Sequence, residues 1–343
     1  MTTIPLIPDV PVGTRRVAVF DTNAYRNFTW GLSLEEARAR SIQLRELEQG
    51  IGEMAFASPL VVWELLAHLA DPTDPGYTHC LHAVVALGEH TREPHTGGIA
   101  MTMDSEWVVC HCLFGKGPDG AEANVSNLAG TACYVRDHAP SIADQTAMAN
   151  LQVFSREMGT RESSWLADVQ DLLNQVNLIG AHLPGQTKNK SAAQLRKLIA
   201  RPQFEELWSM LGVARYAQLA GVTLDGDELE ARAAFFQKEF SVPFRLITGL
   251  LSNMLNNTKA KLSNPKRKRG NFMWDAGICY MIPGASSSSV TTPMRIVTAD
   301  KAIVQAAEAA QCADKVIDLT TYLKELGAPA NWTTTIAGKA ETT

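Results

Sequence analysis

The sequence predicts an α/β domain with a mostly parallel central sheet, interrupted by a largely helical insertion. Short apolar runs alternate with helical patterns near both ends of the chain, as expected where a covering helix follows each strand. The central part instead shows helical spacing with few strand signals. The 343 residues are 45% hydrophobic and 20% charged, which allows a sizeable core and excludes disorder as the dominant state.

The N-terminal part predicts two strands and two helices. Residues Val17 to Phe20 form an apolar run typical of a buried strand, and Met54 to Ala57 predict a second strand. Between them Ser33 and Glu36 form a capping box, which opens a helix. Ser58 precedes a proline, a pair that predicts the N-cap and first turn of the next helix.

The C-terminal part repeats this order of elements. The apolar runs from Arg295 to Thr298 and from Val316 to Asp318 predict two further strands. Residues Asp300 to Ala310 predict a helix between them, and Asn271 to Ile282 predict a helix that begins near Asp275. Strands and helices that alternate at both ends therefore predict one sheet built from two distant parts of the chain.

We expect the discontinuous α/β domain to comprise residues 1–71 and 271–327. Residues 72–270 form the largely helical insertion, because apolar side chains there recur every three or four positions, for example at Met148, Leu151, Phe154 and Met158. Within it, Trp107 to Cys112 looks strand-like. The Thr- and Ala-rich residues 328–343 are expected to be a flexible tail.

Charge and cysteine content restrict the class of protein. The formal net charge of -5 excludes a polycation, so affinity for nucleic acid would have to come from local patches. No stretch of about 18 uncharged apolar residues predicts a membrane span, and no secretory signal is recognisable. The six cysteines are sparse, and Cys110-His111-Cys112 matches no familiar zinc spacing. We expect a reduced, cytoplasmic protein without a membrane partner.

Four acidic residues stand out by their places in the predicted elements. Asp21 follows the first strand and Asp300 follows the third, while Glu64 and Asp275 lie in helices. Ligands of open α/β sheets bind at the carboxyl ends of the strands. A single aspartate after a strand is often only a turn residue or a helix cap, so the ordered set of four carries the prediction.

Together these motifs resemble the PIN-domain nucleases. The matching segments, in the order of the family, are Asp21-Thr22-Asn23, the Ser58-opened helix that carries Glu64, Asp275 in Trp-Asp-Ala, and Thr298 to Lys301. The resemblance covers residues 17–71 and 271–323, and it leaves 72–270 without a counterpart. It implies a PIN-like fold and hydrolysis of phosphodiester bonds that leaves a 5′-phosphate and a 3′-hydroxyl.

The chemistry of the residues agrees with a metal site. Converging carboxylates repel one another unless a cation lies between them, and hard oxygen ligands favour Mg²⁺ or Mn²⁺ over zinc. Asn23 and Thr298 are candidates to orient ligands or the scissile phosphate. The sequence is compatible with one ion or with two. The residues expected to be catalytic and to hold the metal, directly or through water, are Asp21, Glu64, Asp275 and Asp300.

An acid-free basic segment ends shortly before Asp275. It could hold a phosphate backbone that approaches the acids, although a solvated loop is the alternative. A second basic stretch, from Lys188 to Arg201, favours neither contact with nucleic acid nor a solvated loop. The residues of the first segment expected to bind nucleic acid are Lys259, Lys261, Lys266, Arg267, Lys268 and Arg269.

The leading functional hypothesis is therefore a metal-dependent ribonuclease, expected to be an endonuclease. The first alternative is a catalytically weak PIN-fold protein that binds RNA or acts as a scaffold, and the second is a nuclease that acts on DNA. The insertion would recognise substrate, restrain activity, or contact a regulatory partner or a second copy of the chain. A conditional role, as in toxins or defence, is compatible with such an insertion.

Overall fold

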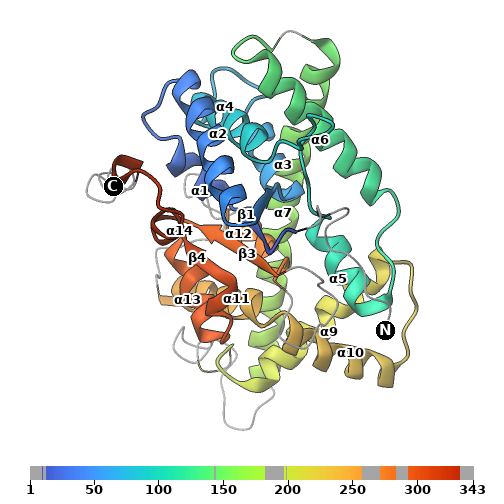
Figure 1. Cartoon of the computed structure of the whole chain (residues 1–343). Coiled ribbons are helices and arrows are strands. Elements are labelled where there is room, and N and C mark those ends of the chain that lie inside the picture. The colour runs from blue at the N-terminus through green and yellow to red at the C-terminus, as the bar shows by residue number, and fades with distance from the viewer. Residues whose placement is uncertain are drawn as a thin grey trace.

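A four-stranded, all-parallel sheet lies at the centre of the structure, a computed structural model (Figure 1). It describes residues 10, 13–142, 144–181, 197, 199–256, 271–282 and 293–332. The strand order is β2-β1-β3-β4, so the predicted α/β class and parallel sheet are confirmed. The strands are β1 (Arg16–Phe20), β2 (Glu53–Phe56), β3 (Met294–Thr298) and β4 (Val316–Asp318).

The sheet brings the two ends of the chain side by side. Val17 to Phe20 in β1 are fully buried, as expected for a central strand covered on both faces. In the register of β1 with β3, Val17 lies opposite Met294 and Phe20 opposite Val297. The backbone N–H of Asp21 continues this pairing by donating to the Val297 carbonyl at 3.0 Å. The residues that follow β1 and β3 therefore lie at one edge of the sheet.

Helices cover the sheet on both sides. In Figure 1 α2 and α4 lie on one side of it, and α11 and α13 lie on the other. The capping box at Ser33 is confirmed, because the Ser33 and Glu36 side chains each accept a hydrogen bond from the backbone of the other residue. Ser58 takes the N-cap position of α3 as predicted, but its side chain makes no capping bond. The helices nearest to the strands in sequence are α1 (Thr22–Phe28), α2 (Leu34–Gly50), α3 (Pro59–Ala67), α13 (Lys301–Ala309), η1 (Ala313–Lys315) and α14 (Leu319–Glu325).

Between β2 and β3 the described residues form helices and two isolated β-bridges, but no strand. The strand-like reading of Trp107 to Cys112 was wrong, because these residues lie in α5. Asp104 caps that helix by accepting from the Glu106 N–H at 2.7 Å, and Gly115 ends it with φ 74°. The helices are α4 (Tyr77–His90), α5 (Ser105–Phe114), α6 (Ala121–His138), α7 (Gln145–Ala181), α9 (Pro202–Leu219), α10 (Gly226–Glu239), α11 (Ser241–Asn256) and α12 (Asn271–Cys279).

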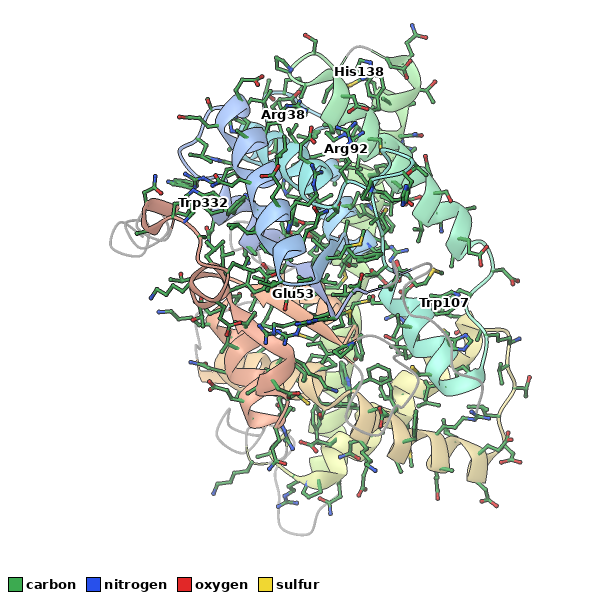
Figure 2. The ribbon with its side chains drawn as sticks, in the orientation of Figure 1. Arg38, Glu53, Arg92, Trp107, His138 and Trp332 are labelled. Atoms are coloured by element: carbon green, nitrogen blue, oxygen red, sulfur yellow. The ribbon has the colours of Figure 1, made fainter. Side chains whose placement is uncertain are left out.

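One hydrophobic cluster joins these helices to the sheet. Trp63 in α3 contacts Phe154 of α7 and Trp274 of α12, with ring centroids 6.2 and 6.3 Å apart. Trp332 is buried against Phe28, with centroids 5.5 Å apart, and Figure 2 shows it beside the N-terminal helices. The described start of the predicted flexible tail is therefore packed. Within the described residues no helix is long and apolar enough to cross a membrane.

Candidate functional site

Asp21 occupies the edge of the sheet where β1 ends and α1 begins. Its Oδ1 caps α1 by accepting from the Ala24 N–H at 2.5 Å, and its Oδ2 accepts from the Thr298 hydroxyl at 2.5 Å. The residue is only 3% exposed. Burial raises the pKa of Asp21 from 3.8 to about 7, with smaller increases from Asp300 and Glu64, although both hydrogen bonds oppose the rise.

Thr298 links Asp21 to Asp300 across the neighbouring strands. The Thr298 hydroxyl, fully buried at the end of β3, donates to Asp21 and accepts from the Asp300 N–H at 2.9 Å. Asp300 in turn caps α13, because its Oδ1 accepts from the Ala302 N–H at 2.7 Å. Thr298 therefore connects the Asp21 carboxylate to the Asp300 backbone, while its role in orienting ligands or the scissile phosphate stays a prediction.

Glu64 reaches the same edge from α3. The Thr22 hydroxyl, one residue after Asp21, donates to Glu64 Oε2 at 2.6 Å. Glu64 is 8% exposed, and burial is the largest cause of its raised pKa. The positive charges of Arg26 and His68 oppose the rise. A hydrogen bond between α1 and α3 therefore sets the place of Glu64 beside Asp21.

Asp275 completes the group of acids. The predicted start of its helix near Asp275 was wrong, because α12 begins at Asn271 and places Asp275 inside the helix. Burial raises the pKa of Asp275 from 3.8 to about 8, and the charges of Asp300, Asp21 and Glu64 raise it further, in that order. The structure thus brings all four acids close enough to act on one another electrostatically, and the three raised pKa values have burial as their main cause.

Several side chains at this site were not predicted from the sequence. Glu162, from α7 in the middle segment, accepts from the Trp274 indole N–H at 3.0 Å and adds to the negative charge near Glu64. Cys279 lies one helical turn after Asp275 and is fully buried, and its raised pKa has contributions from the site acids. These contacts join distant parts of the chain, so no local motif could have indicated them.

The donors available here are carboxylate oxygens. Among the described residues, no group of three or more His, Cys, Asp or Glu side chains is placed so that it could hold a metal ion. Mg²⁺ does not need such a group, since it is usually held by one or two carboxylates and keeps several waters. Asp21, Glu64 and Asp300 accept one or two of the printed hydrogen bonds each and keep further lone pairs, so one or two of the site carboxylates could contribute ligands to such a water-rich ion.

The other predicted site residues lie partly outside the described chain. Asn23 lies in the first turn of α1 and is half-buried. The basic residues from Lys259 to Arg269 and those from Lys188 to Arg196 fall outside the described residues. Lys197 and Arg201 are described and exposed. The predicted nucleic-acid contacts of the first basic segment therefore stay predictions.

Comparisons of the chain with protein-family models, with curated proteins and with solved structures found no match.

Proposed function

We propose that this protein is a metal-dependent nuclease that hydrolyses RNA, as an endonuclease, at the site formed by Asp21, Glu64, Asp275 and Asp300. The observation that supports it best is the convergence of four acids from four separate elements on one edge of a parallel sheet. Buried carboxylates with raised pKa values are stabilised by a proton or by a bound cation, and such groups cluster at catalytic sites.

The chain's own residues would position the reacting groups. Thr298 would hold the Asp21 carboxylate beside the Asp300 backbone, and Thr22 would hold Glu64 beside them. Arg26, whose charge acts on Glu64, is available to bind a phosphate oxygen. A bound Mg²⁺ or Mn²⁺ would neutralise the carboxylates and the scissile phosphate and make the attacking water more acidic. The basic residues from Lys259 to Arg269 would hold the substrate backbone.

The test is cleavage of single-stranded and structured RNA, and of the matching DNA, by purified protein with Mg²⁺ or Mn²⁺. We expect Asp21→Asn to reduce cleavage by at least about 100-fold, because it removes charge from the metal site and keeps an N-cap side chain for α1. Chelation with EDTA should have the same effect as the substitution. Faster cleavage of DNA than of RNA would change the proposed substrate and retain the chemistry.

Asp225→Asn is the matched control. Asp225 also caps a helix, because its Oδ1 accepts from the Glu228 N–H at 2.8 Å, but it lies at the start of α10, away from the four acids. This variant should cleave like the wild type. Equal activity of Asp21→Asn and the wild type would refute the proposal, and metal-independent RNA binding without cleavage would favour the scaffold alternative.

A further inference from the structure

Each of the two acids that lie within helices directly follows a buried tryptophan. Trp63 precedes Glu64 in α3, and Trp274 precedes Asp275 in α12. The centroids of the two indole rings lie 6.3 Å apart, so the rings pack against one another between the two helices. A change in the position of either ring therefore also moves the acid that follows it in sequence.

Both tryptophans donate a hydrogen bond to the same helix, α7 of the middle segment. The Trp63 indole N–H donates to the Phe154 carbonyl at 3.1 Å. The Trp274 indole N–H donates to Glu162 Oε1 at 3.0 Å. Phe154 and Glu162 are about two helical turns apart, so they lie on one side of α7. In Figure 1 α7 extends along the molecule beside α3 and α12. One helix therefore holds both of the helices that carry these acids.

Two further contacts keep α3, α7 and α12 together. The guanidinium carbon of Arg161 in α7 lies 4.2 Å from the centroid of a Trp63 ring, which is a cation–π contact with α3. A Cβ atom at Gly277 of α12 would lie 2.6 Å from Leu60 Cδ2 of α3, so these two helices approach closely at this point. Close-packed interiors transmit the displacement of one element to its neighbours. The position of Asp275 therefore depends on α7.

Glu162 is the residue of α7 at which this dependence can be tested. The acceptor for Trp63 is a backbone carbonyl, which every substitution at Phe154 retains, whereas the acceptor for Trp274 is a side chain. Burial raises the pKa of Glu64, and the charge of Glu162 adds to the rise. Glu162 therefore has two properties, a hydrogen-bond acceptor and a negative charge, and a glutamine at this position keeps only the first.

We propose that Glu162 is a positioning residue of the acidic site, which holds Asp275 in place by accepting from Trp274. Removing an outer partner that orients a metal-binding side chain typically lowers metal affinity or activity by roughly 10- to 100-fold. The middle segment, which has no counterpart in the family that the sequence resembles, is then part of the acidic site. This inference rests on the proposed metal-dependent function, because it concerns the affinity of the same site for its ion.

Calorimetric titration of the full-length protein with Mn²⁺ tests this role. We expect Glu162→Ala to raise the dissociation constant about tenfold, because Asp275 loses its fixed position. Glu162→Gln should stay within about threefold of the wild type, since its amide oxygen still accepts from the Trp274 indole N–H. Glu157→Ala removes an exposed acid of the same helix and is the matched control, which should bind Mn²⁺ like the wild type.

Trp274→Phe tests the same hydrogen bond from its donor. It removes the N–H and retains an aromatic ring, so it should lower the Mn²⁺ affinity as much as Glu162→Ala does. The two changes combined should cost no more than either alone, because both remove one bond. Circular dichroism shows whether each variant is folded. If Glu162→Ala does not fold, the comparison of Trp274→Phe with Glu162→Gln replaces it.

The possible outcomes separate this inference from the proposed function. Equal Mn²⁺ affinity of Glu162→Ala and the wild type would overturn the inference, because Asp275 would then not need the hydrogen bond. Equal losses in Glu162→Ala and Glu162→Gln would also overturn it, because the charge of Glu162 would then be its contribution. In both cases the wild type binds Mn²⁺ and the proposed function stands. A wild-type protein that does not bind Mn²⁺ overturns both, and this is seen before any variant is compared.

Discussion

Buried carboxylates lie at both ends of the central sheet, but only the group at the start of the strands pairs each carboxylate with a basic side chain. Where the strands begin, Glu48 Oε2 lies 2.7 Å from His90 Nε2, and the Tyr322 hydroxyl lies 2.7 Å from Glu48 Oε1 and 3.0 Å from Glu53 Oε2. Arg16 pairs with Glu53 at 2.9 Å. Figure 2 shows Glu53 near the middle of the molecule. We call Glu48, Glu53, His90 and Tyr322 the buried network.

Where the strands end, Asp21, Glu64 and Asp275 are held by hydroxyl and backbone N–H groups or crowded by other acids. Arg26 and His68 compensate Glu64 only in part, since its pKa stays raised. The difference teaches that burial alone does not mark a functional carboxylate. Removing one member of a matched group leaves its buried partners unsatisfied, whereas converging acids without enough positive charge have raised pKa values, which are common at functional sites.

The largest expected effect is on stability, in the buried network. We expect Glu48→Ala to lower the free energy of unfolding by about 3–5 kcal/mol, because it removes the buried partner of His90 Nε2 and one of the two carboxylates at the Tyr322 hydroxyl. Urea denaturation followed by circular dichroism measures this. Glu46→Ala, at an exposed position of the same helix, is the control and should change stability by less than about 0.5 kcal/mol. Equal effects of the two variants would remove the distinction between the two groups of acids.

The acidic site should instead make the metal-free protein less stable as pH rises. The pKa values of Asp21 and Asp275 rise from 3.8 in the ordinary case to about 7 and about 8, so the folded protein holds these protons more tightly than the unfolded chain. The free energy of unfolding should therefore fall by several kcal/mol as the pH rises from about 4 to about 8. Thermal unfolding in EDTA across this pH range measures the slope.

Asp275→Asn and added metal are two further tests of the predicted loss of stability with rising pH. The substitution removes one of the two strongly shifted groups, so the loss of stability with rising pH should become smaller. Mn²⁺ should raise the melting temperature most at the alkaline end of the range, where the site acids are ionised. A stability that rises from pH 4 to pH 8 in EDTA would contradict the proposed proton uptake.

The sequence predicted those features of the fold that depend on local signals. All four strands are short, mostly apolar runs of adjacent residues, and the Ser33 capping box is a pattern four residues long. A short apolar run does not distinguish a strand from a helix, which is why Trp107 to Cys112 was misread. Its helix depends on the cap at Asp104 and on packing against α9.

The two groups of acids differed in how far they could be predicted. Asp21 and Asp300 were found because each follows a strand, a position that a parallel sheet brings to one edge. The buried network carries no such signal, because Glu48 and Tyr322 meet only through packing across 274 positions of sequence. Glu162 was missed at the acidic site for the same reason, since α7 reaches Glu64 only in the folded chain.

The smallest expected effect is at the point where the two regions approach one another. Tyr25 lies one turn after Asp21 in α1, and its hydroxyl is 3.0 Å from His90 Nδ1 in the buried network. We expect Tyr25→Phe to lower the free energy of unfolding by about 0.5–1.5 kcal/mol, because it removes one buried hydrogen bond and retains the ring. The ring packs against Phe20, with centroids 5.3 Å apart, and should stay in place.

The same variant tests whether the buried network supports the acidic site. Nuclease activity and the metal-dependent rise in melting temperature should be unchanged in Tyr25→Phe, because Asp21 is fixed by Ala24 and Thr298 rather than by Tyr25. Glu48→Ala in the Tyr25→Phe background should cost less than the sum of the two single changes, since both act through His90. Loss of activity in a folded Tyr25→Phe protein would instead mean that the two groups of carboxylates work as one unit.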